Sequence, residues 1–191
     1  RAEYLPGIRA WLAEAALGNL HEPLALDVTA PEWPVTGADG VFSANTVHIM
    51  GWPEVERLFH GVAALLAPGA AFCLYGPFAY GGEHTSGSNA SFDASLRQRD
   101  PRMGIRDRYE LETLAGGAGL VLEADHPMPA NNRTLVWRRR CARRASMNDP
   151  FPTRSCCPIR HLTSIASWKP RARSFRPRSI LTAIQPSSPK G

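Results

Sequence analysis

The polar segment between residues 87 and 107 carries the side chains best suited to chemistry. Asn89, Asp93 and Arg97 recur every four residues, so they share one face if the segment is helical. Such a face can bind a small polar molecule, or its acid and base can simply pair with each other. We predict that Asp93 is catalytic and that Asn89 and Arg97 bind substrate; the alternative is a lid held by its own Asp93–Arg97 pair.

Aromatic residues lie just before this segment. Tyr75 ends an apolar run that is typical of a buried strand, and Phe78 and Tyr80 follow it. Ligands of an open α/β sheet bind beyond the carboxyl ends of its strands. The three rings are therefore expected to line a substrate pocket.

A second apolar run, residues 40–45, ends at Asn45 and is followed by Thr46 and His48. These side chains are expected at the same edge of the sheet, facing a bound ligand. The pKa of an ordinary histidine lies near neutrality, so His48 is predicted to be a general base. The alternative is a histidine that only bonds to the backbone.

The surrounding pattern predicts the elements that position these groups. Helical spacing of apolar residues indicates amphipathic helices, and short apolar runs indicate buried strands of a parallel sheet. The class is therefore α/β. The expected elements are a helix over 5–16 ending at Gly18, strands at 24–28, 40–45 and 70–75, a helix from 53 to 66 stopped by Pro68-Gly69, a helix over 108–118, and an antiparallel pair formed by 120–126 and 134–139.

The charge distribution divides the chain near residue 140. Residues 1–140 contain 12 Arg and no Lys against 16 acidic residues, a net charge of −4, whereas residues 141–191 carry a net charge of +9. The second segment also contains seven Pro and eight Ser without apolar periodicity, a composition typical of disorder. We predict a folded domain at 1–140 and a disordered basic tail at 141–191. Contact with nucleic acid is not expected except through that tail. The alternative is that the tail is a solvated appendage that binds no nucleic acid.

Cysteines and hydropathy exclude several other classes. The four cysteines lack the paired spacing of a zinc site, so no metal is expected. No run approaches the roughly 18 apolar residues that span a bilayer, and no signal peptide opens the chain. A cytoplasmic protein without membrane contact is expected.

Several motifs together resemble a known family. They are Tyr75-Gly76-Pro77-Phe78, the segment 88–101, Gly104-Ile105-Arg106-Asp107 and the segment 128–132. Residues 1–140 resemble the DUF938 family of class I S-adenosylmethionine-dependent methyltransferases, of the methyltransferase-like 26 type. The resemblance implies a Rossmann-like sheet with an antiparallel C-terminal hairpin. It also implies that the first strand, glycine-rich turn, helix and second strand would precede Arg1, so the chain is expected to be truncated at its N-terminus.

The resemblance further assigns roles to individual residues. Asp27 would accept a hydrogen bond from the adenine amino group, unless it only caps the following turn, and Asn45 and Thr46 would contact the cofactor S-adenosylmethionine. Arg106 and Asn131 would bind substrate from neighbouring loops. The expected function is methyl transfer to a small molecule of unknown identity. This chain is expected to be inactive because it lacks the glycine-rich turn. The alternatives are a non-catalytic binding or scaffold protein and a nucleotide-dependent oxidoreductase. The oligomeric state is left open.

Overall fold

The computed structural model describes residues 2–141 and 180–182. A five-stranded sheet has the order β6-β7-β2-β1-β8, and a three-stranded sheet has the order β4-β3-β5. The helices are η1 (Ala2–Tyr4), α1 (Leu5–Ala15), η2 (Val47–Ile49), α2 (Trp52–Leu65), α3 (Gly87–Arg99) and α4 (Arg108–Gly117). The strands are β1 (Ala38–Ala44), β2 (Leu66–Gly76), β3 (Phe78–Tyr80), β4 (Glu83–His84), β5 (Arg106–Asp107), β6 (Leu120–Met128), β7 (Asn132–Arg139) and β8 (Ile180–Thr182).

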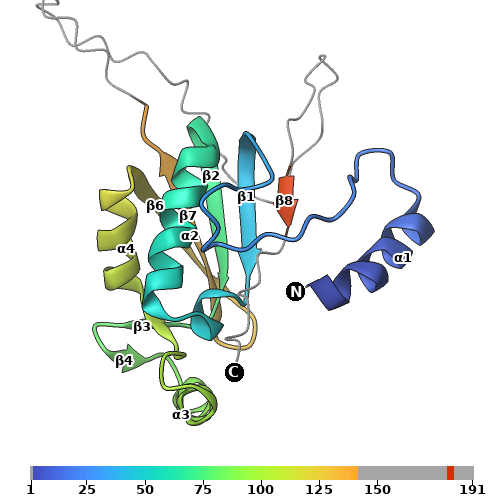
Figure 1. Ribbon diagram of the computed structural model, residues 1–191. Helices are drawn as coiled ribbons and strands as arrows, with labels where there is room; N and C mark the ends of the chain where they lie inside the picture. The colour runs from blue at the N-terminus through green and yellow to red at the C-terminus, as the bar shows by residue number, and fades with distance from the viewer. Residues whose placement is uncertain (1, 142–179, 183–191) are drawn as a thin grey trace, which may run out of the picture.

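The larger sheet is mixed (Figure 1). β1 and β2 run parallel, β7 is antiparallel to β2, and β6 and β7 form an antiparallel hairpin. The expected α/β class and the C-terminal hairpin are therefore confirmed. The parallel pair β1 and β2 brings two carboxyl strand ends to one edge, where the candidate site lies.

The hydrophobic core lies between this sheet and the helices α2 and α4, which cover one of its faces (Figure 1). The ring of Phe59 on α2 meets Phe72 at 5.4 Å and Trp137 at 5.3 Å between centroids, both edge to face. All three rings are completely buried, and such contacts stabilise beyond the area they bury. The predicted apolar stripe of α2 is confirmed.

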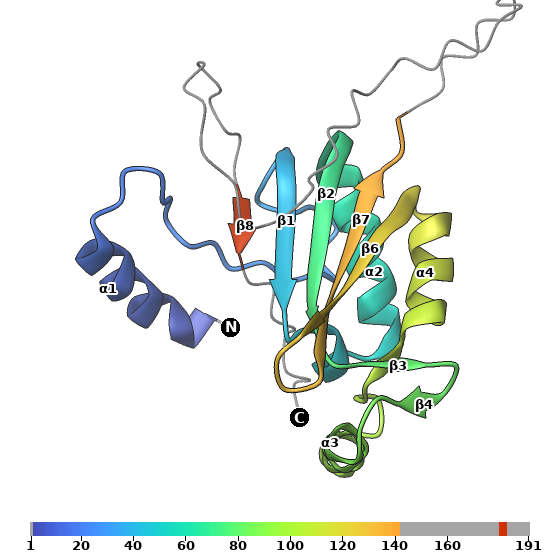
Figure 2. The ribbon, with the colours of Figure 1, turned by 180° about the vertical axis from the view of Figure 1, so that it is seen from behind.

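The opposite face of the larger sheet carries no helix among residues 2–141 (Figure 2). The strand register places Phe42 beside Cys73, and Cys73 beside Val136. Phe42 is 36% exposed, whereas its neighbours Val41 and Ser43 point into the core. Burial raises the pKa of the Cys73 thiol. This face is therefore a partly apolar surface.

Residues 24–28 do not form the predicted strand. They run without strand pairing, and Leu24 is 50% exposed although Val28 is buried. A strand needs a neighbour for its backbone N–H and C=O groups, and the outer edge of β1 pairs with β8 instead. The apolar run identifies an extended segment but not an available partner, so this prediction is wrong.

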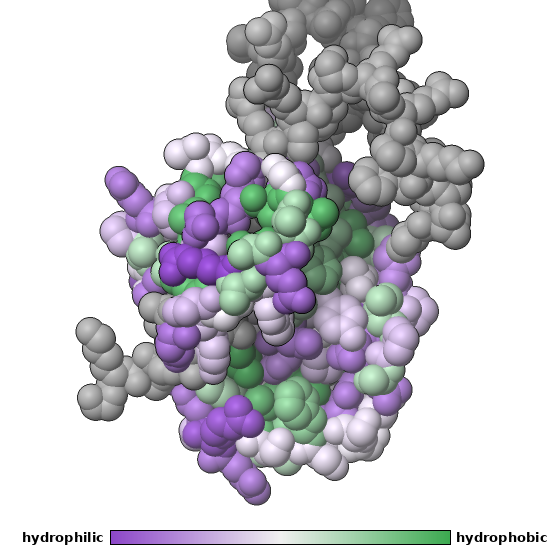
Figure 3. Space-filling model, turned by 90° about the vertical axis from the view of Figure 1, so that its right-hand side faces the viewer, coloured by the Kyte–Doolittle hydropathy of each residue, from purple (hydrophilic) through white to green (hydrophobic). Residues whose placement is uncertain are grey.

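The first helix is present, but it ends earlier than predicted. α1 stops at Ala15, and Ala16 with a φ of 46° takes the left-handed conformation expected at Gly18. No residue of α1 is buried, and Trp11 is 76% exposed. Figure 3 views the molecule from the side on which α1 lies and shows hydrophobic surface among hydrophilic side chains. None of the helices in the described part is long and apolar enough to cross a membrane.

One strand lies in the segment 141–191, for which the sequence predicts disorder. β8 runs parallel to β1, with Ile180 beside Gly40 and Thr182 beside Phe42. Three residues are too few for a recognisable strand pattern, which is why the sequence does not predict β8. The other predictions for the tail concern residues 142–179 and 183–191, which lie outside the described residues.

Candidate functional site

The candidate site begins where β1 and β2 end side by side. Asn45 directly follows β1 with a φ of 54°, and its N–H donates to the carbonyl of Tyr75, 2.9 Å away. Asparagine tolerates this left-handed conformation better than most residues. The buried hydroxyls of Ser43 and Thr46 lie 2.6 Å apart in a hydrogen bond. The turn after β1 is therefore fixed, with the Asn45 side chain exposed and that of Thr46 buried.

His48 lies in η2, just beyond this turn, and is only 5% exposed. Its Nδ1 atom has no hydrogen-bond partner. A Cβ built on Gly76 would lie 3.8 Å from that atom and 3.6 Å from Oδ1 of Asn45. Burial, together with the nearby Arg106 guanidinium, lowers the pKa of His48 to about 4. The imidazole is therefore neutral at pH 7, with an unpartnered buried nitrogen.

The loop before α4 holds the backbone on which His48 lies. The N–H of Gly104 donates to the carbonyl of His48 over 2.9 Å. The Arg106 guanidinium donates to the carbonyl of Val47 over 3.1 Å and also to that of Met50. Burial lowers the pKa of Arg106. Arg106 was predicted to bind substrate, but the structure shows it bound to backbone carbonyls.

Asn89, Asp93 and Arg97 do share one face of α3, as the spacing predicts. Asp93 is 8% exposed and accepts two hydrogen bonds, at 2.6 Å from the N–H of Ile105 and at 2.8 Å from Nε of Arg97. Although burial opposes it, these bonds lower the pKa of Asp93. Gly104 has a φ of 152°, and a Cβ there would lie 2.6 Å from Nη2 of Arg97. Asp93 thus links α3 to the loop that holds His48, and its catalytic role stays a prediction.

Asn89 and Asn131 join α3 to the turn between β6 and β7. The side-chain NH2 of Asn89 donates to Oγ1 of Thr85 over 2.9 Å and to the carbonyl of Asn131 over 3.1 Å. Asn131 has a φ of 58°, and its own amide donates to Oγ of Ser88 over 3.4 Å. Asn89 is buried, whereas Asn131 is exposed. The structure therefore brings these two predicted substrate residues together.

The three predicted aromatic walls have different surroundings. Phe78 is fully buried in the main core and has no open face. Tyr75 is half-buried at the end of β2. The Tyr80 hydroxyl donates to Oδ2 of Asp125 over 2.7 Å, and burial with this bond raises the pKa of Tyr80 to about 12. An aromatic wall of all three rings is therefore not formed.

Asp27 lies in a turn and not at a strand end. Its Oδ1 accepts hydrogen bonds from the N–H and the hydroxyl of Thr29, both at 2.8 Å. This is the turn-capping arrangement that the sequence offered as the alternative. The contact of Asp27 with adenine stays a prediction, although Asp27 does not lie at the end of a strand as that prediction assumed.

The sequence missed two residues at this edge, Phe92 and Gly76. The ring of Phe92 on α3 lies 5.3 Å from that of His48, edge to face, and Phe92 is 37% exposed. A large aromatic residue on a mostly polar helix was a usable signal. The role of Gly76 depends on the spatial approach of Asn45 and His48, which no local pattern shows.

The comparison of family sequences decides the relationship. The sequence profile of the family described as a protein of unknown function, DUF938, matches residues 1–139. The chain belongs to the DUF938 family. This confirms the resemblance drawn from the motifs.

Solved methyltransferases share the fold of this DUF938 chain. The mitomycin 7-O-methyltransferase MmcR matches with a TM-score of 0.60 and 23% identity over 69% of this chain and 38% of its own. An O-methyltransferase family protein from Burkholderia thailandensis matches with a TM-score of 0.58 and 18% identity, over 71% and 40%. Human N-acetylserotonin methyltransferase, solved with S-adenosylmethionine, matches with a TM-score of 0.50 and 14% identity, over 58% and 32%. The chain spans about two fifths of the length of the first two proteins.

Two features of the carboxyl edge in this DUF938 chain bear on whether a cofactor could be held there. A Cβ at Gly76 would be in ordinary van der Waals contact with Asn45 and His48, and Nδ1 of His48 is a buried polar atom without a partner. Asn45, next to both, exposes its side chain. Within the described ranges, no cluster of three His, Cys, Asp or Glu side chains could hold a metal ion.

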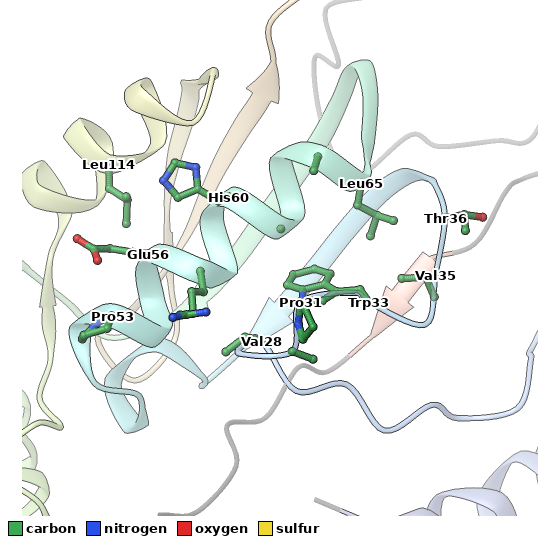
Figure 4. A pocket seen from close by; sticks show the side chains of 14 residues that line it. Val28, Pro31, Trp33, Val35, Thr36, Pro53, Glu56, His60, Leu65 and Leu114 are labelled. Atoms are coloured by element: carbon green, nitrogen blue, oxygen red, sulfur yellow. The ribbon is translucent and has the colours of Figure 1, made fainter.

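A cavity of about 960 Å³ lies elsewhere, between α2 and the loop of residues 28–36. None of the predicted site residues lines it. Its walls include Trp33 from the loop, Leu114 from α4, and Glu56 and His60 from α2 (Figure 4). The indole of Trp33 lies directly against Gly61 of α2. The cavity is thus separate from the carboxyl edge of the sheet.

Replacing Gly61 with alanine is expected to lower the free energy of unfolding by about 1–3 kcal/mol. A Cβ at Gly61 would overlap Cζ2 of Trp33, so the indole and its loop must move. Thermal unfolding measures the effect. The matched control is Gly116→Ala in α4, where a Cβ meets nothing within 4 Å. Equal melting temperatures for the two variants would show that Trp33 is not fixed against α2.

Proposed function

We propose that this DUF938 chain carries the acceptor side of an S-adenosylmethionine-dependent methyltransferase domain that acts on a small molecule. The observation that carries the proposal is the group of Asn45, His48 and Gly76 at the carboxyl ends of β1 and β2. Open α/β sheets bind their ligands at this edge. The shared fold of MmcR and the other methyltransferases supports the same choice of chemistry.

S-adenosylmethionine supplies an electrophilic methyl group when bound. Among the residues of this chain, neutral His48 would orient an acceptor hydroxyl by accepting its hydrogen bond on Nδ1, which has no other partner. The carboxamide of Asn45 orients the bound molecules from the exposed side of the turn. Thr46 supports that turn through its buried bond to Ser43.

Asn45→Gly tests cofactor binding at this edge. Glycine keeps the left-handed backbone and removes only the carboxamide. S-adenosylmethionine is expected to shift the amide NMR signals of Asn45, Thr46 and Gly76, and the variant is expected to weaken binding about tenfold through loss of one hydrogen bond. Gly116→Ala is the control and should bind like the unchanged chain.

Signal shifts confined to the cavity around Trp33 would contradict the proposed site. Equal S-adenosylmethionine binding by Asn45→Gly and the unchanged chain would show that this carboxamide does not contact the cofactor.

A non-catalytic binding protein of methyltransferase fold is the second candidate function. The face of the larger sheet that carries no helix among residues 2–141 and the exposed helix α1 favour it, because Phe42 and Trp11 are partly or largely exposed there. This candidate gains support if cofactor binding fails while the chain remains folded.

A further inference from the structure

The parallel strands β1 and β2 are covered by helices on one face only. α2 and α4 lie over that face, whereas no helix among residues 2–141 lies over the other (Figure 2). Parallel sheets occur almost only with both faces covered, because their strands bury apolar side chains on both sides. The second face of this parallel pair is therefore expected to pack against a further layer.

The side chains on this second face suit a packed layer. Alternate residues of β1 and β2 are buried in the core, so the residues between them point to the second face. The strand register places six uncharged residues there, Gly40, Phe42, Ala44, Ala71, Cys73 and Tyr75. The Arg138–Glu123 ion pair borders this patch on β7 and β6. We call these six residues the β1–β2 face.

α1 is a helix without a packing partner of matching size. None of its residues is buried, and Ile8 and Trp11, three residues apart on one side of the helix, are 38% and 76% exposed. Six of the eleven exposed large apolar side chains in the described part of the chain lie in residues 4–24; they are Tyr4, Ile8, Trp11, Leu17, Leu20 and Leu24. Exposed apolar groups gathered in this way mark an interaction surface.

The connection from α1 to β1 runs along the face that the helices cover. Val28 is 3% exposed in the core on that side, and the indole of Trp33 lies against Gly61 of α2. β8 occupies the outer edge of β1, between this connection and the β1–β2 face (Figure 1). α1 can therefore reach the β1–β2 face of its own chain only by passing around β8.

The free length of this connection is too short for that path. An ion pair of 2.9 Å between Nε of Arg9 and Oε2 of Glu22 holds the segment after α1 against the helix. The six residue steps from Glu22 to Val28 span at most about 21 Å. Layers on opposite faces of a sheet already lie about 20 Å apart, and the path around β8 adds to that distance. α1 of a second copy meets no such restriction.

We propose that two copies of this chain form a dimer in which α1 of each copy packs on the β1–β2 face of the other. Ile8 and Trp11 of one copy would cover Phe42 and Cys73 of the other. The same two surfaces are exchanged in both directions, so the dimer has twofold symmetry and is closed. The inference does not depend on methyl transfer, because none of these four side chains belongs to the candidate site.

Sedimentation of the full chain over a range of concentrations tests the dimer. Trp11→Glu and Phe42→Glu are each expected to raise the dissociation constant at least about tenfold, because a charge replaces a large apolar contact. Tyr109→Glu is the control, since Tyr109 is 51% exposed but lies on α4, over the opposite face. Melting temperatures show whether each variant is folded.

A mixture of the Trp11→Glu and Phe42→Glu variants separates exchange between copies from packing within one chain. The intact α1 of the second variant meets the intact β1–β2 face of the first, so a heterodimer held by one of the two contacts is expected. The unchanged chain decides the matter even if a variant fails to fold. A monomer at every concentration would overturn the inference, as would a dimer that survives both substitutions.

Discussion

Asp93→Ala is expected to lower the free energy of unfolding by about 3 kcal/mol. The buried carboxylate accepts the N–H of Ile105 at 2.6 Å, and its removal leaves that buried N–H without a partner. The loop from Gly104 to Arg106 also holds the turn of His48, so the loss should extend to the candidate site. Chemical denaturation measures the stability, and amide exchange at Ile105 reports the loop.

Arg97→Ala is the matched control for this variant. Arg97 bonds to the same carboxylate, but its side chain is 52% exposed, and an exposed ion pair contributes only about 0.5 kcal/mol. The two variants are therefore expected to differ severalfold in stability loss. Equal losses would mean that the ion pair, and not the bond to the Ile105 N–H, holds α3 to the loop. A stable Asp93→Ala chain that lost only acceptor binding would instead support the catalytic role predicted from the sequence.

Lowering the pH from 7 to 5 is expected to remove about 2 kcal/mol of stability through His48 alone. The pKa of His48 is about 4 in the folded chain and near 6.5 when the chain is unfolded. Below pH 6.5 the unfolded chain takes up a proton that the folded chain refuses, so stability falls. The loss is complete once the pH has passed below about 4. Denaturation series at pH 7, 6, 5 and 4 measure the slope.

His48→Gln is expected to flatten this part of the pH profile, because glutamine does not titrate. His21→Gln is the control, since His21 is exposed and contacts none of the groups at the site. An unchanged slope in His48→Gln would show that the imidazole is protonated as easily in the folded chain as in the unfolded one. The assignment of a strongly lowered pKa to His48 in the folded chain would then be wrong.

Elements with strong local signals could be predicted from the sequence. The apolar stripe of α2, the polar face of α3 and the hairpin of β6 and β7 all follow from the spacing of side chains along a single segment. Residues 24–28 have an equally apolar sequence but no strand beside them, because strand formation depends on a partner from elsewhere in the chain.

The chemistry of the candidate site depended on contacts that a local pattern does not contain. The spacing of Asp93 from Arg97 predicts their pairing, whereas the shorter bond of Asp93 reaches Ile105, twelve residues away. Arg106 was expected at a ligand and instead binds backbone carbonyls of the turn that bears His48. The sequence thus named side chains that meet at this edge, but the three-dimensional contacts decide which remain available to a ligand.

The pairing of β8 with β1 has a consequence for the order of folding. Gly40 pairs with Ile180, about 40 residues beyond the end of β7 at Arg139, and closing a loop of that length onto the formed sheet costs about 3 kcal/mol of chain entropy. The hairpin of β6 and β7 closes across a short turn, so its closure costs far less chain entropy. With only three residue pairs to offset its closure cost, β8 is expected to join the sheet last and to leave it first. Whenever β8 leaves the sheet, the outer edge of β1 is expected to become an unpaired strand edge, the kind of surface on which protein chains begin to aggregate.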